Sequence, residues 1–218
     1  MNYDLAVLKK FKSVIGCDEV GRGPIAGPVN ACAVKVGSIE VIKKLKELNV
    51  TDSKKISEKK RKLILLKLNI KIEEIKLNHV YLNRSLGENF SFCITEHTPA
   101  EIDQINILQA SLSAMKNACE ILGIESSKVL VDGNKTFSCL AETEAVIKGD
   151  SKVLVIGLAS IIAKVFRDEK MKAYDEEFPG YKLGKHAGYP TKEHKLAVQK
   201  LGPSPIHRKS FRGVKEFC

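Results

Sequence analysis

Residues Ser13–Pro24 read SVIGCDEVGRGP, an apolar run followed directly by two carboxylates and a glycine-rich turn. The apolar run predicts a strand over 13–17, with Asp18 and Glu19 at its carboxyl end. The glycines do not match a dinucleotide-binding loop, because the third glycine of G-x-G-x-x-G arrives one residue late and Pro24 has no N–H for a phosphate. Both acids would repel a phosphate at this position unless a divalent cation lay between them.

Further β-type runs along the chain extend this strand into a sheet. Strands are predicted at Ser13–Cys17, Val29–Val36, Ile70–Leu77, Phe90–Thr95, Val129–Val131 and Ala145–Lys148. Helices are predicted from a capping box at Thr98 to Leu122, over Ser151–Phe178, and over Thr191–Leu201. This alternation indicates an α/β fold, and the sheet is expected to be mixed because the early strands follow each other too closely for helical crossovers.

Three of the predicted strands end in an acid, at Asp18-Glu19, Asp132 and Asp150. Ligands of open α/β sheets bind at the carboxyl ends of the strands, so these acids converge if the strands are neighbours. Each acid also has a structural explanation. Asp132-Gly133 is a common turn dipeptide, Asp150 suits a helix N-cap, and Asp18-Glu19 suits a solvated strand end.

Converging carboxylates repel one another, and hard divalent ions relieve that repulsion. Mg²⁺ and Mn²⁺ prefer carboxylate oxygen and water as ligands. Asp18 and Glu19 point to opposite faces of a regular strand, so either a bulge redirects one of them or they serve two separate ions. Two metals that flank one phosphate would stabilise the attacking and the leaving oxygen, which indicates phosphodiester hydrolysis.

The composition indicates one soluble domain with a polyanionic partner. The 218 residues are 44% apolar and carry 36 basic against 26 acidic side chains, a net charge of +10. The run Lys59-Lys60-Arg61-Lys62 is interpreted as a solvated helix face. Trp is absent and aromatic residues make up only 6%, so no stacking platform for single strands is expected.

The cysteines and the apolar stretches bear on location and metal type. The six cysteines form no C-x-x-C pair, which favours reduced, buried thiols over a zinc site. No apolar stretch reaches the length of about 18 to 20 residues that crosses a bilayer. We therefore expect a cytoplasmic protein with no membrane contact.

The chain resembles bacterial ribonuclease HII, the type 2 ribonuclease H, in motifs that occur in family order over nearly its whole length. They are DEVGRGP at Asp18–Pro24, DSKK at Asp52–Lys55, EIDQINIL at Glu101–Leu108, VDGN at Val131–Asn134, KGDS at Lys148–Ser151, ASIIAKV at Ala159–Val165, HAGYPT at His186–Thr191 and HRKSF at His207–Phe211. The resemblance implies a ribonuclease H-like mixed sheet flanked by helices. It divides one structural unit into a core over 1–185 and a helical extension over 186–218.

The resemblance also implies an activity and the residues that perform it. The family cuts RNA within RNA/DNA hybrids, including at a lone ribonucleotide in duplex DNA, with Mg²⁺ or Mn²⁺. Its four acids fall on Asp18, Glu19, Asp132 and Asp150, which the strand-end argument also selects. Its other functional residues fall on Gly21, Arg22 and Gly23, expected to read the ribose 2′-OH and grip phosphates, on Tyr189, expected to pack on a sugar, and on Lys54, a phosphate contact.

Some features depart from the family pattern or leave alternatives open. Ala187 stands where a basic or polar residue is common, and Lys209 stands where arginine is usual, which affects only the outer grip on the backbone. Only 17 residues precede Asp18, which favours type 2 over type 3 enzymes with their N-terminal substrate-binding domain. A monomer is expected. A metal-dependent DNA resolvase or integrase and a non-enzymatic hybrid-binding protein are the alternatives.

Overall fold

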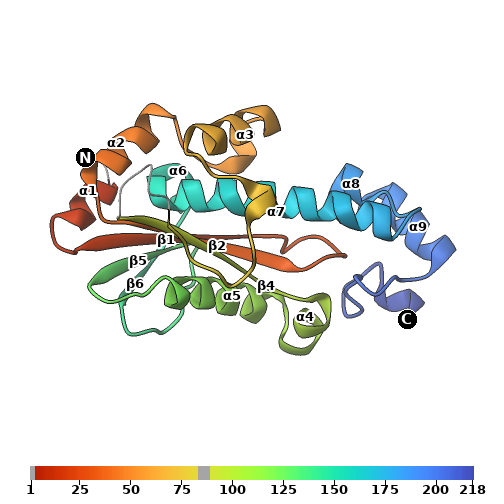
Figure 1. The fold of residues 1–218 in the computed structure, drawn as a ribbon. Helices are drawn as coiled ribbons and strands as arrows, with labels where there is room; N and C mark the ends of the chain where they lie inside the picture. The colour runs from red at the N-terminus through yellow and green to blue at the C-terminus, as the bar shows by residue number, and fades with distance from the viewer. Residues whose placement is uncertain (1–2, 83–88) are drawn as a thin grey trace.

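The computed structural model describes residues 3–82 and 89–218, and these form a six-stranded sheet with helices on both faces (Figure 1). The strand order is β3-β4-β2-β1-β5-β6. Pairing is antiparallel from β3 to β1 and parallel from β1 through β5 to β6, so the prediction of a mixed α/β sheet is confirmed. The strands are β1 Ser13–Val20, β2 Val29–Val36, β3 Tyr81–Leu82, β4 Phe90–His97, β5 Ser127–Asp132 and β6 Glu142–Val146.

Helix α7 (Leu154–Glu177) crosses one face of the sheet, and α5 (Ile107–Ile121) lies against the other (Figure 1). Helices α2 (Ile39–Glu47) and α3 (Glu58–Lys67) pack on the α7 side. The other helical elements among the described residues are α1 Tyr3–Leu8, η1 Ser53–Lys55, η2 Ile72–Glu74, α4 Pro99–Ile105, α6 Gly149–Lys152, α8 Leu183–His186, α9 Lys192–Leu201 and η4 Lys215–Phe217.

Successive residues of β1 alternate between the two cores. Val14 belongs to the core beneath α7, whereas Ile15 and Cys17 belong to the core that faces α5. The strand alternation therefore puts Asp18 on the α7 face. Gly16 is needed on that same face because a Cβ there would lie 2.6 Å from the main-chain N of Ile156. This close approach of α7 to β1 fixes the position of the helix over the carboxyl half of the strand.

Strand β1 is longer than the sequence predicts, and its pairing with β2 is regular along its length. It continues through Val20, so Asp18 and Glu19 lie within the strand and not after it. The register with β2 is unbroken, with Asp18 opposite Cys32 and Glu19 opposite Ala31. The prediction of a strand over Ser13–Cys17 is confirmed, and its carboxyl boundary is moved by three residues.

The predicted strand over Ile70–Leu77 is wrong. This segment contains the 3₁₀ helix η2, closed by hydrogen bonds from Glu74 N–H to Lys71 O and from Ile75 N–H to Ile72 O. Its apolar side chains pack against the core beneath α7 instead of extending the sheet. A short run rich in β-branched residues can pack on helices as well as in a sheet, and the local sequence does not distinguish the two arrangements.

Two predicted helices are interrupted. The helix predicted from Thr98 to Leu122 breaks at Asn106, which has a φ of 65° and whose side chain caps α5 by accepting from Leu108 N–H and Gln109 N–H. The helix predicted from Ser151 starts two residues earlier as α6 and restarts as α7 after extended Val153. The strand predicted over Ala145–Lys148 ends at Val146, because Lys148 takes a left-handed conformation with a φ of 56°.

The predictions for the cysteines and for the basic run are confirmed in part. Cys17, Cys32, Cys93 and Cys119 are buried free thiols, whereas Cys139 is half-buried and Cys218 is exposed. The basic run lies on α3 as expected, but Arg61 points inward and donates to the carbonyls of Ser53 and Ile56. Among residues 3–82 and 89–218, no helix is long and apolar enough to cross a membrane.

The C-terminal region is helical, as expected, and encloses a small core of its own. Helices α8 and α9 pack at the far end of α7 (Figure 1). Their shared core contains Ala26 from the turn after β1 and Met171 from α7, with Tyr181, Leu183, Val198 and Ile206 from the C-terminal region. This core therefore joins the glycine-rich turn to the C-terminal helices.

Candidate active site

Three carboxylates from separate segments meet at one edge of the sheet. Asp18 lies in β1, Asp132 is the last residue of β5, and Asp150 lies in α6, just after β6. One carboxylate oxygen of each lies within 4.8 Å of one from each of the others. They converge because β1, β5 and β6 are parallel neighbours, whose carboxyl ends meet at the same edge.

Main-chain donors orient these carboxylates. Asp132 Oδ1 accepts hydrogen bonds from Gly149 N–H at 2.7 Å and from Asp150 N–H at 3.3 Å, which attaches the start of α6 to the end of β5. Asp18 Oδ1 accepts from Glu19 N–H at 2.8 Å, and the nearby Ser160 side chain from α7 acts to lower the pKa of Asp18. The oxygens are thus held in place before any ligand binds.

The electrostatics of the cluster favour a cation. Burial raises the pKa of Asp18 well above its usual value, and the charges of Glu19 and Asp132 raise it further. Burial also raises the pKa of Asp150, with added repulsion from Asp132 and Asp52. Oxygen is the only donor element in this group, which fits Mg²⁺ or Mn²⁺ and not a zinc site. Asp18, Asp132 and Asp150 are the residues that would hold such an ion.

Glu19 stands apart from the three converging carboxylates. The regular register of β1 with β2 leaves no bulge that would turn it toward Asp18. Its side chain is 12% exposed, and Oε1 lies 3.3 Å from NH1 of Arg22. Burial raises the pKa of Glu19, Arg22 opposes the rise, and Asp132 adds to it. Of the two alternatives drawn from the sequence, the geometry favours the one in which Asp18 and Glu19 serve separate positions.

The glycine-rich turn and the tyrosine come together beside the acids. Gly21 has a φ of 98°, a conformation that favours glycine. A Cβ on Gly23 would lie 3.2 Å from Cε1 of Tyr189, so the tyrosine ring covers that glycine. Ile25 N–H donates to Gly188 O at 2.9 Å, which joins the two segments through the main chain. Gly23 and Tyr189 therefore lie against each other, although they are 166 positions apart in the sequence, whereas Gly21 is buried against Arg167.

Two buried histidines support the main chain at Tyr189. Ser204 N–H donates to Nδ1 of His207, so the His207 proton lies on Nε2. This Nε2–H donates to Nε2 of His194 at 3.0 Å, and Nδ1–H of His194 donates to Tyr189 O at 3.0 Å. Burial lowers the pKa of both histidines to about 4, which keeps both rings neutral near pH 7. The chain of hydrogen bonds requires this neutral state.

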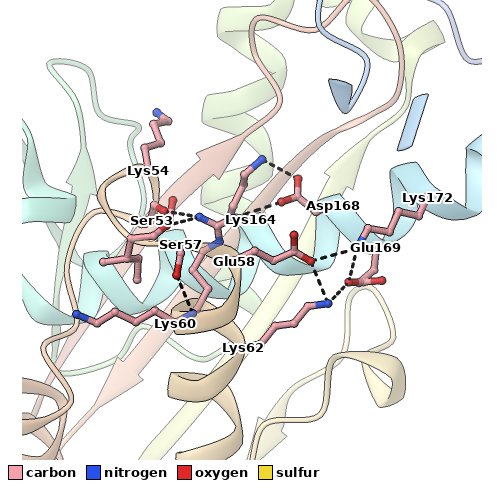
Figure 2. A network of polar contacts seen from close by, with 12 residues as sticks. Ser53, Lys54, Ser57, Glu58, Lys60, Lys62, Lys164, Asp168, Glu169 and Lys172 are labelled. Carbon is pink, nitrogen blue, oxygen red and sulfur yellow. Dashed lines mark hydrogen bonds and ion pairs between the residues drawn. The ribbon is translucent and has the colours of Figure 1, made fainter. Parts of the chain in front are cut away.

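Lys54 lies in the DSKK turn, close to the acids. Figure 2 shows the Lys54 side chain pointing away from the contacts formed by its neighbours. Burial raises the pKa of Asp150, and the charge of Lys54 opposes this rise. On the same turn Ser53 Oγ lies 2.8 Å from Ser160 Oγ, which attaches the turn to α7. Lys54 is thus an exposed cation near the carboxylates.

Several residues around the site were not selected from the sequence. Asp52 and Ser160 contact the acids, and the buried Arg167 and Arg208 surround the glycine-rich turn. Ser160 gave a weak signal as the polar residue of an otherwise apolar stretch, GLASIIA. Arg208 lies in a basic segment whose composition is typical of a surface loop, so the local sequence does not indicate that this side chain is buried.

The chain matches known ribonucleases over nearly its whole length. The family model described as Ribonuclease HII matches residues 15–214. Ribonuclease HII of Hydrogenovibrio crunogenus is 43% identical over 204 residues, covering 94% of this chain and 87% of that protein. Ribonuclease HII of Francisella tularensis is 40% identical over 202 residues, covering 93% of this chain and 96% of its relative.

Solved structures share the fold. Ribonuclease H2 from Pyrococcus horikoshii superposes with a TM-score of 0.69 at 24% identity, covering 94% of this chain and 96% of that one. Bst-RNase HIII in complex with Mn²⁺ superposes with a TM-score of 0.62 at 17% identity, covering 97% of this chain and 71% of that one. With the family model and the bacterial relatives, the chain belongs to the ribonuclease HII family of endoribonucleases.

Proposed function

We propose that this endoribonuclease hydrolyses RNA phosphodiester bonds in RNA/DNA hybrids and on the 5′ side of single ribonucleotides embedded in duplex DNA, leaving 3′-hydroxyl and 5′-phosphate ends. The observation that carries the proposal is the convergence of Asp18, Asp132 and Asp150 at β1, the strand that continues into the glycine-rich turn, where Tyr189 covers Gly23. Of these residues, Asp18 and Gly23 belong to one continuous segment, which consists of β1 and the turn that follows it.

The acids are assigned to metal binding. Asp18, Asp132 and Asp150 would hold Mg²⁺ or Mn²⁺ directly, and Glu19 would serve a second ion from the opposite face of β1. Two bound divalent ions supply Lewis-acid stabilisation of the attacking and leaving oxygens of an in-line displacement. The Mn²⁺ complex of Bst-RNase HIII, which shares the fold, supports this assignment. Hydrogen bonds from Gly149 N–H and Glu19 N–H keep the oxygens of Asp132 and Asp18 oriented.

The remaining residues are assigned to recognition. Gly21, Arg22 and Gly23 would contact the ribose 2′-OH and nearby phosphates, since glycine permits close main-chain approach and the 2′-OH distinguishes RNA from DNA. Tyr189, 41% exposed, would pack on the deoxyribose that follows the ribonucleotide. Lys54 would contact a phosphate. This division separates the groups that do chemistry from those that bind.

We extend the proposal to the domain organisation, the oligomeric state and the cellular location of the protein. Residues 1–185 would form the catalytic core, and residues 186–218 would form an extension that carries Tyr189 to the acids. The shared core around Ala26, Met171 and Val198 supports this arrangement as one structural unit. We propose a monomer that acts in the cytoplasm on ribonucleotide-containing duplexes, where its buried thiols stay reduced.

A panel of duplexes tests the proposed function. End-labelled duplexes with one ribonucleotide, four ribonucleotides or none are incubated with Mg²⁺ or Mn²⁺ and resolved on a denaturing gel. We expect cleavage of the first two and none of the third. Cleavage of the all-DNA duplex would indicate a DNA nuclease such as a resolvase, and binding of hybrids without cleavage would indicate a non-enzymatic protein.

A further inference from the structure

Two arginines are buried behind the glycine-rich turn without a carboxylate partner. Arg167 on α7 is 1% exposed, and Arg208 in the C-terminal segment is fully buried. Within the described part of the chain, neither guanidinium forms an ion pair with a carboxylate. Burial lowers the pKa of Arg167 to about 10 and that of Arg208 to about 9, so both remain charged near pH 7. Buried charges without a counterion are costly, and they need a function or strong dipolar compensation.

The compensation comes from the main chain of the turn itself. Arg208 uses all five of its donors on carbonyls, at 2.6 to 3.2 Å, and these belong to Gly21, Arg22, Pro24, Gly27 and Pro28. Arg167 donates to Pro28 O, to Ala26 O at 3.1 Å and to Ala187 O at 3.4 Å. The main-chain N–H of Arg208 donates to Ile25 O at 2.9 Å.

This set of contacts turns the acceptors of the loop inward. Of the eight carbonyls between Gly21 and Pro28, six accept from a guanidinium and a seventh from the Arg208 main chain. Carbonyl oxygens on the outer surface would repel phosphate, whereas N–H groups attract it. Among the described residues, no main-chain partner is found for the N–H groups of Arg22 and Gly23. The loop therefore has free main-chain N–H groups for a ligand, whereas its carbonyl oxygens point inward and accept from the arginines.

The arginines also fix the loop relative to the tyrosine. Arg167 bonds the carbonyls of both Ala26 and Ala187, two residues from Tyr189. A Cβ on Gly21 would lie 2.8 Å from Cζ of Arg167, so loop and guanidinium are in tight contact. One side chain thus sets the spacing between the two halves of the surface that contacts the sugar.

We propose that Arg167 and Arg208 are positioning residues for ribonucleotide recognition: they shape Gly21–Pro28 so that it presents N–H groups to the sugar and phosphate, with two positive charges behind it. This inference rests on the proposed function of the loop. A planar guanidinium with five donors can bridge this many carbonyls, whereas a lysine ammonium has three donors and no planar fork. Arginine geometry, and not charge alone, is the required property.

The test is Arg208→Lys, which keeps the charge and removes the geometry. Steady-state cleavage of a duplex with one ribonucleotide gives kcat/KM, and an all-DNA duplex added as a competitive inhibitor gives Ki. We expect kcat/KM to fall at least tenfold while Ki stays within twofold of wild type, because charge-driven binding is retained and recognition of the ribonucleotide is lost. Tyr181→Phe is the control, since it removes a hydrogen bond to Gly202 O in the same region and leaves every hydrogen bond to the carbonyls of Gly21–Pro28 in place, so both constants should persist.

Each outcome decides the matter. Wild-type kcat/KM in folded Arg208→Lys overturns the inference, and so does a rise in Ki that parallels the fall in kcat/KM, because that indicates a general loss of binding. If Arg208→Lys does not fold, Arg167→Lys is measured in the same way. If neither folds, both side chains are structural and the inference fails. A wild-type enzyme that does not cleave the ribonucleotide duplex would instead refute the proposed function.

Discussion

Asp18→Asn should make the protein more stable and less active at the same time. Asparagine keeps the shape and an oxygen that accepts from Glu19 N–H, but it removes one charge from a group of three carboxylates within 4.8 Å. At that separation, one like-charge pair costs about 0.9 kcal/mol at the dielectric constant of water and about 3.5 kcal/mol at an effective value of 20. Burial and the charges of Glu19 and Asp132 raise the pKa of Asp18, as expected of a carboxylate whose charge is unfavourable at its position. We expect a gain of about 1 to 3 kcal/mol in the free energy of unfolding without divalent cations.

Thermal and urea unfolding in EDTA and in excess Mn²⁺ measure this effect. For a chain of this size the gain in EDTA corresponds to roughly 2 to 4 °C in Tm per kcal/mol. Mn²⁺ at 100 times its dissociation constant should stabilise wild type by about 2.7 kcal/mol and the variant by less, so the difference narrows or reverses. Turnover of a ribonucleotide-containing duplex should fall by at least about 100-fold, since a metal ligand is lost.

Asp4→Asn is the matched control for Asp18→Asn. Asp4 is also a buried aspartate whose pKa is raised by burial, but it accepts from Leu154 N–H and Val155 N–H at the start of α7. Its replacement should lower stability equally in EDTA and in Mn²⁺. An Asp18→Asn protein that is less stable than wild type in EDTA and that turns over normally would refute the electrostatic account of the site.

Three further predictions follow from individual residues. His207 has a pKa of about 4 when folded and near 6.5 when unfolded, so the stability that it contributes should be fully present above pH 6.5 and should be lost toward pH 4, by up to about 1.4 kcal/mol per pH unit. Urea unfolding should show a smaller decline over this range for His207→Asn. Tyr189→Ala should reduce cleavage of a single-ribonucleotide duplex more than cleavage of a continuous hybrid, and an equal loss on both gels would make Tyr189 a turn residue. Gly21→Ala should lower kcat/KM at least about tenfold, because a Cβ at this positive φ is strained and collides with Arg167. The control is Gly202→Ala, at a similar φ with no atom within 4 Å of the added Cβ, which should lose about 1 kcal/mol of stability and keep its activity. Equal activities of the two variants would show that Gly21 has no role in catalysis.

The sequence predicts the elements whose cause is local. The strand at Ser13, the capping box at Thr98 and the acids near strand ends depend on neighbouring residues, and each is found in the fold. The predicted strand over Ile70–Leu77 failed because its apolar residues pack on helices. A short run of isoleucines suits either a strand or an irregular segment that packs on helices, so only tertiary packing decides between the two.

The site shows the same division between local and tertiary causes. The strand ends predict which acids converge, and the separation of Asp18 from Glu19 follows from strand geometry. The support of the glycine-rich turn by Arg208 depends on a segment more than 100 residues away. A basic motif such as HRKSF carries no local sign that one arginine is buried beneath the loop it shapes.

Analysis of the product ends on a duplex with one ribonucleotide tests the central claim most directly. The wild-type protein is incubated with this duplex in Mg²⁺ and, separately, in EDTA, and the fragments are identified by mass spectrometry. The account predicts one cut on the 5′ side of the ribonucleotide in Mg²⁺, with a 3′-hydroxyl on one fragment and a 5′-phosphate on the other, and no cut in EDTA. Cleavage in EDTA, or ends that carry a 2′,3′-cyclic phosphate, would contradict metal-dependent hydrolysis at this acidic cluster.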